Sequence, residues 1–335
     1  MPQPKPLHPQ ALAVMQKYAS LGLPSNTEVS AQQARINGNI GRAAFDLEKE
    51  HVARTYERVI DGIDGDIELR IYEPDGDGLH PLVMLFHGGG WVAGDLDAED
   101  TTCRGLSLRV GAVVVSVDYR LAPETRFPGG LEDCYAATVW AVEHANELNI
   151  LPHLLAVSGT SAGGNLAAAV SLLARDRGGP NIAHQLLYCP ITDYDLDRQS
   201  YIDFSSDYYL TREAMAWFWD HYLGLEGDGL SPYASPLKAA DLAGLPDATV
   251  VTAECDPLLD EGVDYARALE AAGVRTAYRE YDGMFHGFNN RTGLIDAAKD
   301  ALDFGAEQIK KTFALMDHAK NTCDTTTTET LHPFT

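Results

Sequence analysis

The stretch LLAVSGTSAGGNL, residues 154–166, constrains the fold more than any other part of this 335-residue chain. It begins with an apolar run of strand length and leads into an Ala- and Leu-rich segment of helical character, residues 165–175. Between them lies the sequence GTSAG, residues 159–163. A glycine on each side of the serine allows a sharp backbone turn, which leaves the hydroxyl of Ser161 exposed. The stretch therefore predicts a strand, a tight turn that carries a nucleophilic serine, and a helix.

Strand-like and helix-like segments alternate along most of the chain. Short apolar runs predict strands at residues 82–86, 112–117, 154–157, 185–188, 248–253 and 275–281. Helices are expected between them at residues 98–109, 131–148, 165–175, 261–272 and 295–315. Nearly continuous apolar strands are typical of burial on both faces of a sheet. The alternation therefore predicts an α/β fold with a mostly parallel, doubly wound sheet.

The N-terminal part of the chain departs from this alternation. Residues 56–72 alternate in polarity around two Asp-Gly pairs, which predicts an antiparallel hairpin at one edge of the sheet. Residues 1–50 are mostly polar, and helical spacing of apolar residues predicts a short helix at residues 11–18. A second helix is expected at residues 43–53. A helix this short is marginal alone, so it must pack on the rest of the protein.

A second departure lies between residues 193 and 242, where no strand-like run occurs. Its segment 210–223 is helical in character and holds an aromatic cluster, Trp217, Phe218, Trp219 and Tyr222, which we interpret mainly as core. We expect this insertion and residues 1–50 to form a helical cap. The α/β domain would then comprise residues 51–192 and 243–320, and the low-complexity tail 321–335 is expected to be disordered.

Composition excludes several classes of partner. The formal net charge of −24 would repel phosphate backbones and anionic lipids, so neither nucleic acid nor a membrane is an expected partner. Five cysteines without a C-x-x-C pair favour buried free thiols over disulfides. No metal-binding spacing and no dinucleotide-binding glycine motif occurs, so we expect no metal and no cofactor. The N-terminus lacks an apolar leader, which favours a cytoplasmic location.

A glycine-rich loop follows the strand expected at residues 82–86. Its sequence, HGGGW, residues 87–91, lets backbone N–H groups approach a ligand closely. Acyl transfer needs such donors because negative charge develops on the carbonyl oxygen in the transition state. The N–H groups of Gly89, Gly90 and Ala162 are the predicted oxyanion donors.

A serine nucleophile needs a base, and His286 is the best candidate among the eleven histidines. It follows the last expected strand, so it belongs to the edge of the sheet that also carries Ser161. The carboxylate that orients the histidine must come from the preceding strand end. Asp256 is favoured there over Glu254 and over Asp260, which is instead expected to cap the next helix.

The order Ser161, Asp256, His286 matches that of α/β-hydrolases. The motifs HGGGW (87–91), YRLAPE (119–124), GTSAGG (159–164), DPL (256–258) and HGF (286–288) together resemble the hormone-sensitive-lipase-like family of carboxylesterases. The resemblance implies an α/β-hydrolase fold, a helical cap, the oxyanion donors named above, and a homodimer. Many members carry Asp directly before the serine. Thr160 stands here, so the chain resembles the GTSAG branch.

These residues predict a serine carboxylester hydrolase that acts on a small-molecule ester. The resemblance suggests short to medium acyl chains. Three alternatives share the fold: a non-catalytic small-molecule receptor, a hydrolase of amides or lactones, and an acyltransferase. The YRLAPE segment is interpreted as structural support beneath the site.

Overall fold

The strands of the protein form one eight-stranded sheet in the order β1-β2-β4-β3-β5-β6-β7-β8. This computed structural model describes residues 5–45, 49–206 and 208–327. The strands are β1 (Arg54–Asp61), β2 (Asp66–Glu73), β3 (His80–Phe86), β4 (Val113–Asp118), β5 (Ile150–Thr160), β6 (His184–Tyr188), β7 (Asp247–Cys255) and β8 (Thr276–Phe285). Strands β3 to β8 pair in parallel, and β2 pairs antiparallel with both β1 and β4. The predicted sheet and its antiparallel edge hairpin are confirmed.

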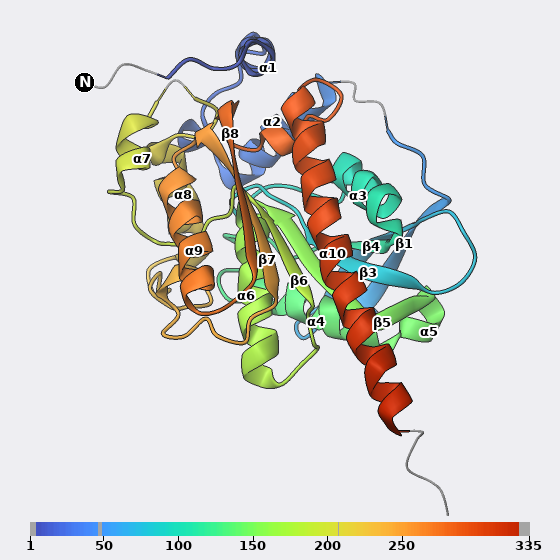
Figure 1. Ribbon diagram of the computed structural model, residues 1–335. Coiled ribbons are helices and arrows are strands. Elements are labelled where there is room, and N and C mark those ends of the chain that lie inside the picture. The colour runs from blue at the N-terminus through green and yellow to red at the C-terminus, as the bar shows by residue number, and fades with distance from the viewer. Residues whose placement is uncertain (1–4, 46–48, 207, 328–335) are drawn as a thin grey trace, which may run out of the picture.

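Helices cover both faces of the sheet (Figure 1). One face carries α3 (Asp100–Leu106), which continues as a π-helical turn (Ser107–Gly111), and α10 (Asp296–Thr327). The other face carries α4 (Gly129–Glu143), α6 (Ala162–Arg177) and α9 (Leu259–Ala271), and α5 (Ala145–Leu148) precedes β5. Apolar side chains fill both layers because the central strands present buried residues on each face. The sheet thus lies between two hydrophobic cores.

The N-terminal helices differ from the prediction. Helix α1 (Pro9–Ala19) lies where expected, and a 3₁₀ turn (Asn26–Glu28) leads to α2 (Ala31–Ala43). The helix expected at residues 43–53 is wrong: α2 ends at Ala43, residues 49–53 are not helical, and residues 46–48 lie outside the described residues. The glycines and amides of α2 weaken its sequence signal, whereas the Ser30 hydroxyl caps it by accepting a hydrogen bond from the Gln33 N–H at 3.2 Å.

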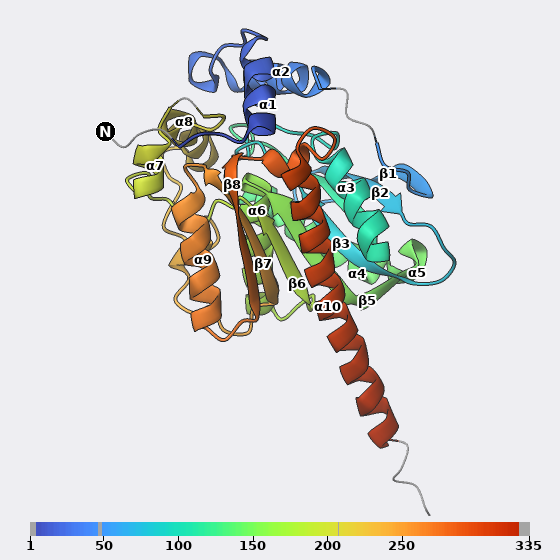
Figure 2. The same ribbon diagram turned by 45° about the horizontal axis from the view of Figure 1, so that its top comes forward.

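The insertion between β6 and β7 contains short helices and no strand over its described residues. These are α7 (Gln199–Asp203), α8 (Arg212–Leu223) and a 3₁₀ turn (Pro236–Lys238). Figure 2 shows α1 and α2 above one end of the sheet, with α7 and α8 beside them. Two regions far apart in the sequence therefore meet over the same end of the sheet.

Two further expectations concern the cysteines and the C-terminal segment. Cys103, Cys134, Cys189 and Cys255 are free and buried, as expected, and the side chain of Cys323 lies outside the described residues. Helix α10 continues to Thr327, so the expected disordered tail is helical from residue 321 to 327, and the remaining residues 328–335 lie outside the described part. Among the described residues, no helix combines the length and the apolar character that crossing a bilayer needs.

Candidate active site

Ser161 stands at the junction of β5 and α6 in a strained conformation. Its φ of 60° and ψ of −119° are rare for a residue with a side chain. The turn is held because the Ser161 N–H donates to the Tyr188 carbonyl at 2.8 Å, and the Ser161 carbonyl accepts from the Asn165 N–H at 2.9 Å. A Cβ atom at Gly159 would overlap the backbone of Gly163, and one at Gly163 would overlap the Phe86 carbonyl. Only glycine fits these two positions.

The three side chains that the motifs singled out form one hydrogen-bonded series. The Ser161 hydroxyl lies 2.9 Å from Nε2 of His286, and Nδ1 of that imidazole lies 2.8 Å from Oδ2 of Asp256. The Asp256 Oδ1 accepts a second hydrogen bond from the Leu258 N–H at 2.9 Å, which fixes the carboxylate. All three side chains are buried: Ser161 is 7% exposed, His286 6% and Asp256 1%. The arrangement can pass a proton from the serine to the imidazole.

The two competing carboxylates have other partners. Glu254 accepts a hydrogen bond from the Gly283 N–H at 2.7 Å and pairs with Lys5 at 2.9 Å. Asp260 accepts from the Ser200 N–H at 2.8 Å. The expectation that Asp260 caps α9 is wrong, since the helix begins at Leu259 and Asp260 lies within its first turn. Glu254 therefore binds β8 and Lys5, and Asp260 binds α7, rather than the imidazole.

The N–H groups expected to bind the oxyanion have no hydrogen-bond acceptor within the described chain. Across the described residues, the N–H groups of Gly89, Gly90 and Ala162 donate no hydrogen bond to another part of the chain. Gly89 has a φ of 118°, and a Cβ there would overlap the Ala93 carbonyl. Ala162 is the first residue of α6, where backbone N–H groups have no partner within the helix. These donors suit an anionic oxygen next to Ser161.

A cavity of about 470 Å³ opens over these residues. Its floor includes Gly89, Gly90, Ser161 and His286. One wall is apolar and comes from α8 and the residues before it: Leu210, Ala214, Met215 and Phe218. Another part of the lining, called the polar wall below, includes Asn37, Arg42, Glu99, Asn290 and Arg291. Helix α2 and the insertion thus enclose the space in which a substrate would meet the serine.

Known proteins are similar to this chain in sequence and in fold. Residues 83–290 match a family model described as the alpha/beta hydrolase fold. The chain is 45% identical to the carboxylic ester hydrolase LipN of Mycobacterium tuberculosis over 69% of this chain and 63% of LipN, and 41% identical to esterase LipI of that organism over 77% and 82%. A thermostable esterase of Pseudomonas putida superposes with a TM-score of 0.88 at 36% identity, covering 92% of this chain and 98% of that one.

This chain belongs to the α/β-hydrolase family of carboxylesterases. The match spans less than two thirds of the length of LipN but most of LipI.

Thr160 of this esterase joins a polar network. It occupies the position directly before Ser161, where Asp was noted above for many members of the family that the motifs resemble. Its hydroxyl accepts from the Asn289 side chain at 2.8 Å and lies 3.5 Å from Oδ1 of Asn290. The Asn290 amide in turn donates to Oε1 of Glu99 at 2.8 Å. Burial raises the pKa of Glu99, while its hydrogen-bonding neighbours oppose that rise. The carboxylate next to this network is thus supplied by Glu99, which lies in none of the sequence motifs described above.

The aromatic cluster of α8 divides between the core of the esterase and its cavity. Trp219 and Tyr222 pack on Trp91, as expected for core residues. Phe218 also lines the cavity and packs against Gly90, where its ring would overlap any Cβ. Phe218 therefore belongs to the buried core cluster and to the cavity lining at once. Its role depends on the rotation of α8, which residue type does not reveal.

The YRLAPE segment supports the site through its side chains. The Tyr119 hydroxyl donates to the His87 carbonyl at 2.8 Å, and its ring stacks on the His87 imidazole. Arg120 forms a bidentate pair with the buried Asp133 at 2.7 and 2.8 Å. Glu124 pairs with Arg35 of α2. These contacts agree with the structural role that we expected for this segment.

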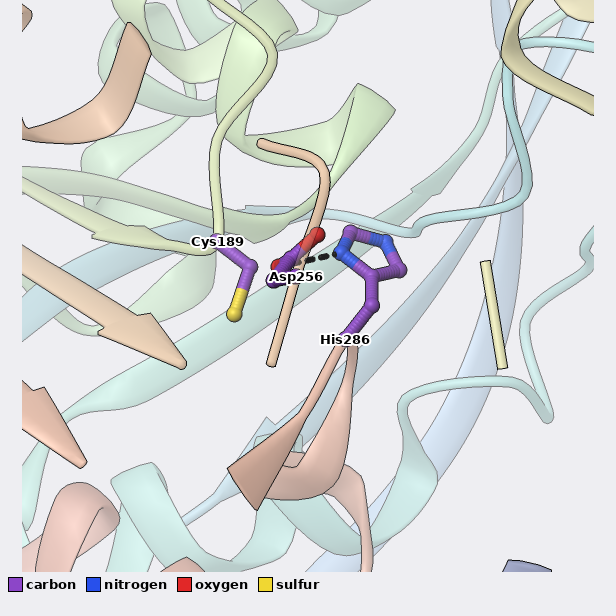
Figure 3. Close-up of side chains that lie close together, drawn as sticks. All are labelled: Cys189, Asp256 and His286. Carbon is purple, nitrogen blue, oxygen red and sulfur yellow. Dashed lines mark hydrogen bonds and ion pairs between the residues drawn. The ribbon is translucent and has the colours of Figure 1, made fainter. Parts of the chain in front are cut away.

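Cys189 lies beside the His–Asp pair of the esterase (Figure 3). Its sulfur, an Asp256 oxygen and a His286 nitrogen lie within 4.8 Å of one another, a grouping whose composition could hold a metal ion. Burial raises the pKa of the Cys189 thiol well above its usual value, with a further contribution from Asp256. The protonated thiol is a poor metal ligand and a poor nucleophile. Nothing in the sequence around Cys189 indicated this position.

Proposed function

We propose that this esterase hydrolyses small carboxylic esters with short to medium acyl chains through Ser161, His286 and Asp256. The observation that carries the proposal is the hydrogen-bonded series from the Ser161 hydroxyl through the imidazole to the buried carboxylate, which opens directly into the cavity. The apolar wall formed by Met215 and Phe218 favours an aliphatic or aromatic substituent next to the ester.

The reaction proceeds in two halves. In the first, the Ser161 oxygen attacks the ester carbonyl while Nε2 of His286 takes the hydroxyl proton. Asp256 accepts the hydrogen bond from Nδ1–H and stabilises the imidazolium. The N–H groups of Gly89, Gly90 and Ala162 hold the oxyanion, and the alcohol leaves with the proton from Nε2. In the second half, His286 deprotonates a water molecule, which attacks the acyl-enzyme and releases the acid.

The proposal extends to the setting of the reaction. Residues 1–50 and 193–242 act as a cap over the α/β domain of residues 51–192 and 243–320. A cytoplasmic location, a homodimer, and independence from metals and cofactors stay predictions.

The first prediction compares two buried serines of β5 and its turn. Ser161→Ala should lower kcat on p-nitrophenyl esters by roughly 10⁴- to 10⁶-fold without unfolding the protein, because it removes the nucleophile. It should also abolish covalent labelling by a fluorophosphonate. Ser158→Ala is the matched control, since Ser158 is buried on β5 three residues before Ser161 and its hydroxyl has no hydrogen-bond partner among the described residues.

Near-normal turnover or labelling of Ser161→Ala would remove this serine from the mechanism. Wild-type protein that binds a fluorophosphonate only reversibly would favour a receptor. A series of p-nitrophenyl esters of increasing acyl length then measures the chain-length preference, and amide or lactone substrates and added alcohols test the other two alternatives.

A further inference from the structure

The polar wall of the active-site cavity contains an arginine without a carboxylate partner. Arg291 directly follows the 3₁₀ turn Phe288–Asn290 that begins two residues after His286, and it lines the same cavity as Ser161. No Asp or Glu oxygen among the described residues lies within 4.0 Å of its guanidinium. By contrast, Arg42 on the same wall is neutralised by Asp95 through two contacts of 2.8 and 2.9 Å.

The guanidinium of Arg291 is held in place while donors stay open. It lies over the ring of Phe45, 5.5 Å from the centroid, and Nη1 donates to the carbonyl of Asn290 at 3.3 Å. The Nε atom is buried and has no hydrogen-bond acceptor in the described part of the chain. An arginine that stacks on an aromatic ring and keeps donors free is well suited to bind a carboxylate.

A second buried donor lines the same cavity. Asn37 of α2 is 5% exposed, and its Oδ1 accepts from the Gln33 side chain at 3.0 Å. Its Nδ2 is left without an acceptor among the described residues. Buried polar groups are nearly always paired in native proteins, so two unpaired donors in the lining of one cavity point to an acceptor supplied by a ligand.

Glu99 is a carboxyl group of the polar wall, and in its ionised form it would repel a bound anion. It is 1% exposed, and Oε1 accepts from the Asn290 amide at 2.8 Å. Burial raises its pKa, while its hydrogen-bonding neighbours and the charge of the nearby Arg291 lower it, and its Oε2 has no hydrogen-bond partner among the described residues. The overall charge of −24 also repels anions at long range, so an anionic substrate would need a dedicated local cation.

We propose that Arg291, assisted by Asn37, forms a carboxylate-binding subsite, so that the esterase prefers esters that carry a free carboxylate a few atoms from the scissile carbonyl. This inference rests on the proposed function, because it assigns a substrate class to the site built around Ser161. The carboxylate can lie on the acyl side, as in a monoester of a dicarboxylic acid, or on the alcohol side, as in an acylated hydroxy acid.

Two matched pairs of substrates distinguish a carboxylate on the acyl side from one on the alcohol side. On the acyl side, the p-nitrophenyl monoester of glutaric acid is compared with that of glutaramic acid, its neutral amide counterpart. On the alcohol side, O-butyryl-4-hydroxybutyrate is compared with the corresponding amide, with acid release followed by titration at constant pH. The readout for each pair is the ratio of kcat/KM for the anionic ester to that for the neutral ester.

Arg291→Gln should lower this ratio by roughly 10- to 100-fold for one of the two pairs, the size expected for a lost hydrogen bond to a charged group. Arg291→Lys should recover part of the ratio because it restores the charge. Arg126→Gln is the control, since Arg126 also has no carboxylate within 4.0 Å among the described residues, lies outside the cavity lining and changes the net charge equally. It should keep the ratio within about twofold of the wild-type value.

A ratio that Arg291→Gln leaves unchanged for both pairs would overturn the subsite. The same holds if Arg126→Gln lowers the ratio as much as Arg291→Gln, because the effect would then come from net charge. A different result would contradict the proposed function itself: Ser161→Ala would hydrolyse the neutral esters as fast as the wild type.

Discussion

Ser161 and Cys189 share an unusual backbone conformation at the ends of neighbouring strands. Ser161 follows β5 with a φ of 60°, and Cys189 follows β6 with a φ of 42°. Each such residue costs about 1–3 kcal/mol, so the surrounding structure must hold both in place. The Ser161 N–H donates to the carbonyl of Tyr188, which precedes Cys189, so the two strained turns support each other. Strain is thus concentrated where the serine must face the cavity.

A buried histidine away from the site gives a prediction about acid stability. His184 hydrogen-bonds through its two ring nitrogens to Thr312 and Thr249, each at 2.9 Å, and burial lowers its pKa from 6.5 to about 4. Between these pH values the unfolded chain binds a proton that the folded chain does not. The contribution of His184 to stability is therefore complete above pH 6.5 and is lost as the pH falls toward 4.

Urea unfolding at several pH values measures this effect. Between pH 6.5 and 4.5 the unfolding free energy of the wild type should fall by about 2 kcal/mol more than that of His184→Gln, at roughly 1.4 kcal/mol per pH unit. His87, whose pKa burial also lowers to about 4, and Asp118, whose pKa burial raises to about 6, are present in both proteins and cancel in the comparison. Parallel curves for the two proteins would contradict the assignment.

At the scale of residues, sequence patterns located the side chains that lie at strand ends. Ser161, Asp256 and His286 could be singled out because each follows an apolar run at the same edge of a parallel sheet, and the structure brings them together. Phe218 and Arg291 could not be found in this way. Their places on the cavity walls depend on how helices and loops pack, and neither lies in a motif that requires its residue type.

At the scale of elements, two arginines hold α2 to the α/β domain: Arg42 pairs with Asp95, and Arg35 makes the larger set of contacts. The Nε of Arg35 donates to the Val92 carbonyl at 2.7 Å, and Nη2 donates to the Ala122 carbonyl at 2.9 Å. The same guanidinium forms a bidentate pair with Glu124. Since α2 provides Asn37 and Arg42 to the cavity, Arg35 sets the position of the polar wall.

Arg35→Met should therefore lower kcat/KM for small esters by roughly tenfold or more, because hydrogen bonds from a charged donor are each worth about 1.5–3 kcal/mol. Circular dichroism checks that the fold is retained. Glu124→Gln keeps both carbonyl contacts and loses only a largely exposed ion pair, worth about 0–1 kcal/mol, so its effect should be much smaller. Equal losses in the two variants would show that the ion pair, and not the carbonyl contacts, positions α2.

The strands were easier to predict than α2 for a physical reason. Central strands such as β4 and β6 are buried along all or nearly all of their length, so their apolar sequence alone reveals them. Helix α2 buries mainly small residues, Ala31, Ala34 and Gly41, and Gly41 lies against the ring of Tyr18. A helix that packs through small side chains and is held by polar contacts of its arginines carries little hydrophobic periodicity.

At the scale of the whole molecule, the surplus of acidic residues sets the response to salt. A net charge of −24 opposes the compact state by self-repulsion, and added salt screens it. Exposed ion pairs such as Arg212–Asp197 lose strength in salt as well, but each contributes only about 0–1 kcal/mol.

We therefore expect the melting temperature to rise by several degrees between 20 mM and 1 M sodium chloride, roughly 4 °C or less per kcal/mol for a chain of this size. Scanning calorimetry measures it, and an equal osmolarity of sucrose serves as the control for exclusion from the protein surface. A melting temperature that does not change with salt would mean that the surplus charges lie too far apart to repel one another. The sequence gives the net charge but not these separations.

The glycines at the Ser161 turn also have a practical consequence for protein engineering. Gly159 and Gly163 press against the backbone so closely that no side chain can replace their hydrogen atoms. In a saturation library that included these codons, most clones would encode protein that does not fold. Randomising Leu210, Ala214 and Met215 instead alters the shape offered to the substrate while the chemistry stays intact, so altered enantiopreference should be sought there.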